Sequence, residues 1–215
     1  KWFGIGGVLG MIALAGATMT SDNRMQRISI WLDPSRCKIT DETLYFGICR
    51  QPMHARFALA EGGLTGIGLG ASKEKWQWLP EPHNDFIFAI IGEELGLVGA
   101  LIVLGLFAVF GYAAYRLVVR TDDFFVRIAA SGVMVWILVQ AIVNIGAVIG
   151  ALPIIGVPLP FVSSGGSSLI TTMLGAGVLL AFARAEPGCA EALSLRPKSV
   201  RGGAAVLSRS RGKRS

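Results

Sequence analysis

Four long apolar segments alternate with polar segments along this 215-residue chain. They predict helices at about residues 2–20, 86–116, 128–152 and 167–184. A helix rises about 1.5 Å per residue and the hydrocarbon of a bilayer is about 30 Å thick, so each segment is long enough, or nearly so, to span it. The pattern therefore predicts an all-α polytopic membrane protein with four transmembrane helices.

The composition agrees with this fold class. Hydrophobic residues make up 53% of the chain and charged residues only 16%. The 28 glycines suit packed transmembrane helices, in which small residues let backbones approach one another. Because the chain opens directly at the edge of the first apolar segment, we expect it to be part of a longer protein.

Basic residues predict the orientation. The segment from Arg184 to the end of the chain carries eight Lys or Arg against two Glu, an excess equal to the net charge of the whole chain, +6. Three more arginines lie between the second and third apolar segments. The positive-inside rule makes both regions cytoplasmic. Residues 20–85 then form one large extracellular loop, and residues 187–215 form a disordered basic cytoplasmic tail rather than a nucleic-acid-binding patch.

Two of the three cysteines, Cys37 and Cys49, fall in the expected extracellular loop. A disulfide between them is compatible with that compartment, and two free thiols are the alternative. His54 and His83 have no metal-ligand spacing to these cysteines, which argues against a zinc site.

An acidic cluster precedes the second apolar segment. Glu81, His83 and Asp85 lie just before it, and Glu93 and Glu94 lie near its start. Ionisable groups at a membrane interface are costly unless they face a cavity or a partner, so they are candidates for function. A carboxylate there suits a general base, because partial removal from water raises the pKa of a carboxyl group.

The apolar stretch between the third and fourth segments contains three prolines, which exclude a continuous helix. Irregular backbone at this depth survives only where protein or a water-filled cavity satisfies its polar groups. One interpretation is an ordinary surface turn. The other is a polar wall beside the start of the fourth helix, suited to an anion, with Ser167-Ser168 as the helix N-cap. The serines of this wall are Ser163, Ser164, Ser167 and Ser168.

Several strings, in this order and at these separations, resemble the SEDS family of FtsW, RodA and SpoVE proteins. They are SDNRMQRI at 21–28, WLDP at 31–34, GIGLG at 66–70, SKEKW at 72–76, LPEPHNDFIFAIIGEELG at 79–96 and PLPFVSSGGSS at 158–168. The resemblance covers residues 1 to about 186 and is strongest to the actinobacterial division branch, FtsW. Two positions depart from the family pattern: His54 replaces the second Gln of Gln-x-x-Gln, and Ser164 stands where a Tyr is frequent.

The resemblance implies a ten-helix bundle, of which these would be the last four helices. It implies a peptidoglycan glycosyltransferase of the bacterial inner membrane that polymerises lipid II during septal cell-wall synthesis and releases undecaprenyl pyrophosphate. A class B penicillin-binding protein and other divisome membrane proteins are the implied partners. The catalytic Asp of the family maps onto Asp85. With six helices missing, this chain alone is expected to be inactive.

A departing pyrophosphate needs positive charge beside it. The candidates are Lys73 and Lys75, with Arg50 or Arg56 as alternatives, or a divalent cation (Mg or Mn) held by Asp85 and Glu81. No tightly bound cofactor is expected. Glu93 and Glu94 are expected to pair with Arg or Lys in the missing helices. The GIGLG string does not fit a phosphate-loop spacing, which favours a turn.

Two other classes of function remain open. A flippase would use the same cavity to move a lipid-linked precursor across the membrane. A divisome scaffold would bind partners without catalysis. The requirement for Asp85 distinguishes these functions from the enzyme, because only a polymerase needs a carboxylate base held in a defined position beside its substrate.

Overall fold

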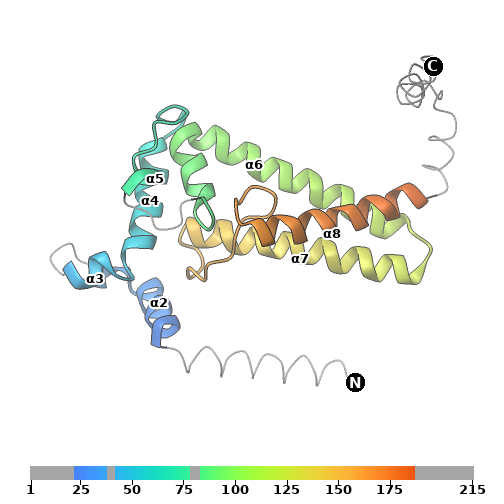
Figure 1. Cartoon of the computed structure of the whole chain (residues 1–215), viewed down its shortest axis with the longest axis horizontal. Helices are drawn as coiled ribbons and strands as arrows, with labels where there is room; N and C mark the ends of the chain where they lie inside the picture. The colour runs from blue at the N-terminus through green and yellow to red at the C-terminus, as the bar shows by residue number, and fades with distance from the viewer. Residues whose placement is uncertain (1–21, 38–41, 78–82, 187–215) are drawn as a thin grey trace, which may run out of the picture.

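The computed structural model describes residues 22–37, 42–77 and 83–186. All regular elements among these residues are helical. They are α2 (Asp22–Leu32), the 3₁₀-helix η1 (Pro34–Arg36), α3 (Glu42–Phe46), α4 (Arg50–Gly62), α5 (Glu74–Gln77), α6 (Ile87–Arg120), α7 (Phe124–Val148) and α8 (Gly166–Ala185). The long helices α6, α7 and α8 lie side by side, and α2 to α5 gather at one end of them, here called the loop end (Figure 1).

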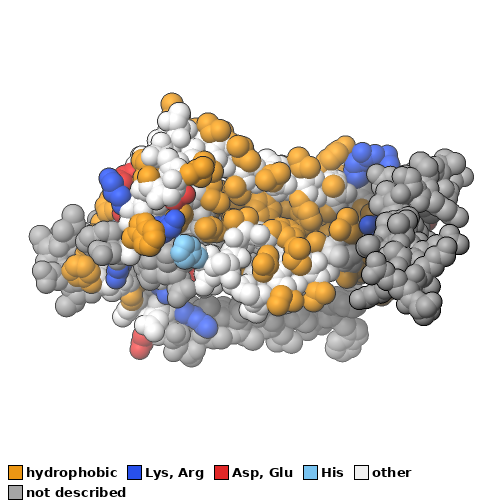
Figure 2. Space-filling view, turned by 45° about the horizontal axis from the view of Figure 1, so that its top comes forward, with side chains coloured by type: hydrophobic (Ala, Val, Ile, Leu, Met, Phe, Trp, Pro, Cys, Tyr) orange, Lys and Arg blue, Asp and Glu red, His pale blue; other side chains and the backbone are white. Residues whose placement is uncertain are grey.

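Helices α6, α7 and α8 are each long and apolar enough to cross a membrane. Large hydrophobic side chains cover much of their visible face, while charged side chains lie toward the two ends (Figure 2). Exposed apolar residues such as Leu106, Val109 and Ile142 suit contact with lipid. The all-α prediction is confirmed for the described residues. The expected helix at residues 2–20 lies outside them, so the four-span and ten-helix architecture stays a prediction.

Helix α7 begins four residues before the expected start of the third segment. The carboxylate of Asp123 accepts hydrogen bonds from the backbone N–H groups of Phe125 (2.8 Å) and Val126 (3.3 Å), and so caps the free amides of the first turn. The helix ends at Val148, because Gly150 follows in the left-handed conformation (φ 81°) that commonly ends a helix.

Helix α8 begins at Gly166, and Gly165 occupies the N-cap position without a side-chain hydrogen bond. The expectation that Ser167-Ser168 caps this helix is therefore wrong. Both serines lie within the first turn, and their carbonyl groups accept hydrogen bonds from the hydroxyl group of Thr171, at 3.0 Å each. Glycine serves at this N-cap because it adopts an extended conformation there at little cost.

The second predicted helix, 86–116, is interrupted at Gly96, which has non-helical dihedral angles (φ 66°, ψ −160°). Its short first part lies beside α4 and is turned sharply from the long second part (Figure 1). An L-residue with a side chain rarely adopts this conformation. A Cβ atom at Gly96 would also lie 2.4 Å from the backbone nitrogen of Gly66. The break therefore depends on glycine.

The loop after α4 satisfies the backbone groups that the break in α6 sets free. Four hydrogen bonds join the two segments: Ile67 N–H to Glu93 O (3.0 Å), Gly68 N–H to Glu94 O (3.1 Å), Leu97 N–H to Gly63 O (2.9 Å) and Val98 N–H to Leu64 O (3.4 Å). Backbone polar groups near a membrane need such partners, because unsatisfied ones are costly. The glycine-rich string at 66–70 is thus a turn whose backbone is engaged by α6.

Two apolar clusters hold the helices together. The larger lies at the loop end and joins Ala55 of α4, Phe86 and Phe88 around the start of α6, Val148 of α7 and Leu159 of the segment between α7 and α8. The smaller lies at the opposite end and joins α6, α7 and α8 through Ala114, Leu117, Ala130 and Leu179. The segment between α7 and α8 (residues 149–165, here called the connector) is thereby packed into the larger cluster.

Cys37 and Cys49 are joined by a disulfide with a Cα–Cα distance of 5.6 Å. Cys49 is fully buried and sits at the N-cap of α4, and Cys37 follows η1. Non-reduced peptides of protein from an oxidising compartment should therefore contain Cys37 and Cys49 linked, as mass spectrometry would show. Cys37→Ser should lower the free energy of unfolding by up to about 3 kcal/mol. Recovery of both cysteines as free thiols would contradict the assignment.

Gly96→Ala in the full-length protein should destabilise the fold by about 2 kcal/mol or more, because it combines backbone strain with a clash against the loop after α4. Thermal unfolding in detergent would measure this as a lowered Tm. The matched control is Gly105→Ala in the same helix, where an added Cβ meets no atom within 4 Å. Equal Tm values for the two variants would show that the break does not depend on Gly96.

Candidate functional site

Asp85 lies directly before α6, where the first part of that helix meets α7 and the connector. Its side chain is half-buried, and the following residue, Phe86, is fully buried at the N-cap of α6. A Cβ atom at Gly156 would lie 3.2 Å from Asp85 Oδ2, so the carboxylate rests against the connector backbone. Asp85 also lines a small cavity with Asn144 and Val157.

Asn144 of α7 holds the backbone on both sides of this cavity. Its Nδ2 donates to the carbonyl oxygen of Asp85 at 2.8 Å and to that of Val157 at 2.6 Å. The side chain is 3% exposed, and its Oδ1 has no hydrogen-bond partner among the described residues. One buried amide thus fixes the position of Asp85 relative to α7 and the connector.

A second amide supports the connector one helical turn earlier on the same face of α7. Gln140 Nε2 donates to the carbonyl oxygen of Pro158 at 3.1 Å. Residues four apart on a helix lie on one face, so Gln140 and Asn144 form a short polar track along α7. This track supplies donors to a proline-containing segment that cannot form helical hydrogen bonds of its own.

Two of the predicted site residues, His83 and Ser164, come together. The backbone N–H and the Oγ of Ser164 donate to the carbonyl oxygen of His83 at 3.1 and 3.0 Å, and its Oγ lies 3.1 Å from Asn84 Oδ1. These bonds join the segment before α6 to the end of the connector across about 80 residues of sequence. Ser164 therefore positions the backbone two residues before Asp85.

The other predicted serines have different surroundings. Ser163 is 4% exposed, and its Oγ accepts a hydrogen bond from Gly165 N–H at 3.4 Å, so it stabilises the turn into α8. Ser167 and Ser168 line a groove between α7 and α8 together with Gln140 and apolar side chains. This groove and the Asp85 cavity share wall residues, which include Val143 and Val157.

The predicted lysines face acidic partners near α4 and α6. Lys73 Nζ lies 3.5 Å from Glu61 Oε2, and Lys75 Nζ lies 3.6 Å from Glu94 Oε1. Lys75 also lies over the ring of Trp76, 5.4 Å from its centroid. Their charges are thus largely balanced within the loop end.

Glu93 is fully buried, and its carboxylate accepts hydrogen bonds from Ser72 Oγ (2.6 Å) and from the backbone N–H of Lys73 (2.8 Å). Glu93 and Glu94 thus have partners within this chain, and their expected pairing with Arg or Lys of the missing helices stays a prediction. Both attach α5 and the loop before it to the first part of α6, and so belong to the same framework as the break at Gly96.

A buried pair in the loop end was not recognised from the sequence. His54 Nδ1 lies 2.7 Å from Glu74 Oε2, and the hydroxyl of Tyr45 lies 3.4 Å from His54 Nε2. Burial raises the pKa of the Glu74 carboxyl above its ordinary value, and the adjacent His54 ring opposes this shift. This pair attaches α5 to α4. His54, which replaces the second Gln of the Gln-x-x-Gln pattern, therefore has a structural role here. His54 and Glu74 are 20 positions apart in the sequence, and no helix or strand periodicity predicts a contact at that separation.

Metal binding has little support among the described residues, which contain no group of three His, Cys, Asp or Glu able to hold an ion. Glu81, the second expected ligand beside Asp85, lies outside the described residues. A cation shared by Glu81 and Asp85 stays a prediction.

These features define a class: a multi-pass helical membrane protein in which broken helices at one end place a carboxylate against buried backbone. The profile of the FtsW, RodA and SpoVE family of cell cycle proteins matches residues 1–187. The chain belongs to this family, which confirms the family predicted from the sequence.

Curated relatives and a solved structure agree with this assignment. The chain is 44% identical over 183 residues to a probable peptidoglycan glycosyltransferase FtsW of Mycobacterium tuberculosis, covering 85% of this chain and 34% of that protein. It is 40% identical over 162 residues to the peptidoglycan glycosyltransferase MrdB of Escherichia coli, covering 75% and 42%. A solved peptidoglycan synthase complex that coordinates polymerization and crosslinking matches with a TM-score of 0.57 and 27% identity, covering 84% of this chain and 49% of that one. The chain thus spans about a third to a half of the length of these proteins.

Asn144→Leu should destabilise the site, because it keeps the branched shape of the side chain but leaves two buried carbonyl groups without their donor. Each such loss costs about 1–3 kcal/mol, so a lowered Tm and faster amide hydrogen exchange in the connector are expected. Asn23→Leu, an exposed substitution of the same kind in α2, is the control. Unchanged exchange in the connector of Asn144→Leu would show that this amide does not hold it.

Proposed function

We propose that this chain contributes the catalytic carboxylate of a peptidoglycan glycosyltransferase that polymerises lipid II into glycan strands and releases undecaprenyl pyrophosphate. The observation that carries the proposal is the placement of Asp85, whose backbone is fixed by Asn144 and whose carboxylate lies against the connector. The activity named for the FtsW and MrdB relatives supports it.

In this proposal Asp85 is the general base. Its carboxylate takes the proton from the attacking sugar hydroxyl, whose oxygen bonds to the anomeric carbon of the second substrate. The bond from that carbon to the pyrophosphate breaks, and the pyrophosphate leaves with the electron pair. A single displacement without an enzyme nucleophile inverts the anomeric centre.

The predicted histidine and serines divide into two roles. Ser163 and Ser164 are positioning residues, because their side chains contact backbone close to Asp85 or to the start of α8. His83 meets Ser164 through its backbone carbonyl group and its side chain is exposed, so we assign it to contact with substrate. Ser167 and Ser168 line the groove that borders the Asp85 cavity, and we assign them to contact with substrate.

We further propose that the protein lies in the bacterial inner membrane at the division septum, with the loop end outside and the C-terminus cytoplasmic. The disulfide at the loop end supports this orientation, since disulfides persist in oxidising compartments.

A class B penicillin-binding protein is the proposed partner, supported by similarity to a synthase complex that couples polymerization to crosslinking. Other divisome membrane proteins are proposed partners through the same membrane.

The test is Asp85→Asn in the full-length protein, assayed with purified lipid II and the cognate transpeptidase. Asparagine keeps the size of the side chain but cannot take the proton, so the polymerisation rate should fall about 10²- to 10⁴-fold. Thermal unfolding and co-purification with the partner should be unchanged, because the half-buried carboxylate is no part of the apolar core.

The control is Asp122→Asn, an exposed position between α6 and α7 at the opposite end, assayed at matched protein level. It should polymerise at the wild-type rate. Near wild-type polymerisation by Asp85→Asn would refute the general-base assignment. Translocation of lipid II without polymer would favour a flippase, and neither activity would favour a scaffold.

A further inference from the structure

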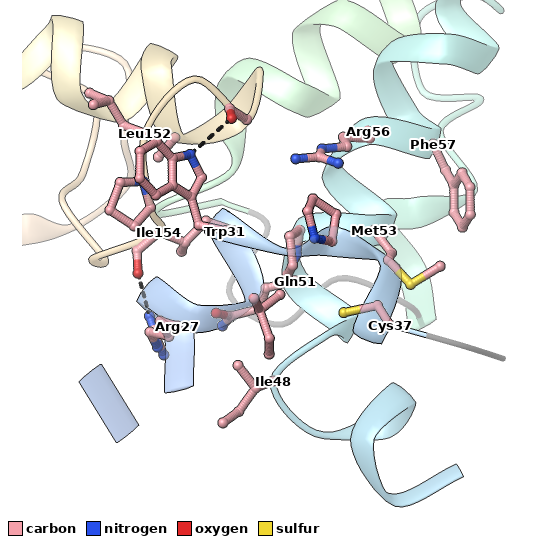
Figure 3. A pocket seen from close by; sticks show the side chains of 16 residues that line it. Arg27, Trp31, Cys37, Ile48, Gln51, Met53, Arg56, Phe57, Leu152 and Ile154 are labelled. Atoms are coloured by element: carbon pink, nitrogen blue, oxygen red, sulfur yellow. Dashed lines mark hydrogen bonds between the residues drawn. The ribbon is translucent and has the colours of Figure 1, made fainter. Parts of the chain in front are cut away.

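A second cavity, of about 220 Å³, opens at the loop end between α2, α4 and the start of the connector (Figure 3). Its walls are mainly apolar and include Trp31, Met53 and Ile154. Its polar side chains include Gln51 and two arginines, Arg27 and Arg56, and none of the described residues that line it is acidic. The cavity thus combines apolar surface with two positive charges.

Neither arginine has a carboxylate partner among the residues that the structure describes. Arg27 Nη1 donates to the carbonyl oxygen of Ile154 at 3.1 Å, which leaves its charge unbalanced. The guanidinium of Arg56 extends from α4 toward the connector (Figure 3) and lies so close to Gly150 that a Cβ atom there would be 2.6 Å from Nη2. Guanidinium groups stay protonated in proteins, so both charges are permanent.

This arrangement contrasts with that of the two lysines predicted to bind pyrophosphate. Lys73 and Lys75 have Glu61 and Glu94 as partners, and an incoming anion would compete with those carboxylates. An anion entering the arginine cavity meets no carboxylate among the described residues that line it. Arginine also offers a planar fork of donors that matches phosphate oxygens bidentately.

The arginine cavity borders the Asp85 site. Ala147 and Ile154 line both this cavity and the small cavity next to Asp85. The two cavities therefore share part of one wall. Trp31, whose Nε1 donates to Gly150 O at 3.1 Å, fixes the outer wall against the end of α7 (Figure 3).

We propose that Arg27 and Arg56 bind the diphosphate of a polyprenyl-linked sugar, with Trp31 and Met53 against the adjoining apolar chain. This inference rests on the proposed function and adds to it a site for the leaving group. Preorganised donors placed where negative charge develops stabilise the departing diphosphate. The arginines, rather than Lys73 and Lys75, then supply the charge that this step needs.

The experiment measures binding of undecaprenyl diphosphate to the purified full-length protein in neutral detergent by calorimetry, without turnover. Arg56→Gln should weaken binding at least tenfold, and Arg56→Lys should restore part of it. Arg27→Gln should weaken binding similarly. The control is Arg36→Gln, which removes an exposed charge of the same loop end that is paired with Asp33, and it should bind as the wild type does.

Competition identifies the source of the phosphate. Excess phosphatidylglycerol or inorganic diphosphate should displace undecaprenyl diphosphate poorly, because neither offers both the diphosphate and the polyprenyl chain. Equal displacement by phosphatidylglycerol would overturn the proposal in favour of a general anionic-lipid site. Wild-type affinity in Arg56→Gln would overturn it outright.

Loss of binding through misfolding, and failure of the proposed general base, can both be told apart from failure of the diphosphate site. Arg56 is exposed, and the structure gives it no hydrogen bond within the described part of the chain, so Arg56→Gln should keep the wild-type Tm even if Arg27→Gln loosens the connector. Binding is measured without polymerisation, so a failure of Asp85→Asn to lose activity would refute the general base while leaving the diphosphate site intact.

Discussion

At the loop end, backbone N–H and C=O groups that are not in regular helices must find hydrogen-bond partners, and this constraint determines how that end is built. Helix α6 is interrupted at the loop end and helix α7 ends there, and unsatisfied N–H and C=O groups of the irregular backbone are costly. The break at Gly96 is compensated by hydrogen bonds from the loop after α4. The polar backbone groups of the connector are satisfied by side chains from two helices: Asn144 and Gln140 from α7, and Arg27 and Trp31 from α2. The loop end is therefore a necessary part of the membrane fold.

The same bonds explain how the candidate site is held. Asn144 and Ser164 contact backbone next to Asp85 rather than any group expected to react. They fix the start of α6 against the connector, and so hold the backbone that carries Asp85 in place. A site supported by buried amides is more rigid than its loop sequence indicates, and a base must be held within a fraction of an ångström of its productive position.

Features that depend on the length and composition of a segment, such as membrane helices, could be predicted from the sequence. Features that depend on contacts between distant segments could not. Uninterrupted apolar runs were sufficient to predict α6, α7 and α8 as membrane helices, and the three prolines predicted an irregular connector. The break at Gly96 was missed, because a glycine in an apolar helix is common and the hydrogen-bond partners that stabilise the break come from some 30 residues away. The contacts of Lys75 with Glu94 and of His54 with Glu74 were missed for the same reason.

The break in α6 also determines where the chemistry lies. In a continuous helix Asp85 would stand about 16 Å beyond Gly96 along the axis, toward water and away from α7. The turn at Gly96 instead places the first part of α6 beside α4 and brings Asp85 to Asn144 at the end of α7. There it adjoins the cavity of Arg27 and Arg56, which lies against the same end of α7. One glycine thus allows a carboxylate to lie next to two guanidinium groups that have no carboxylate partner among the described residues, the combination that transfer of a sugar from a diphosphate requires.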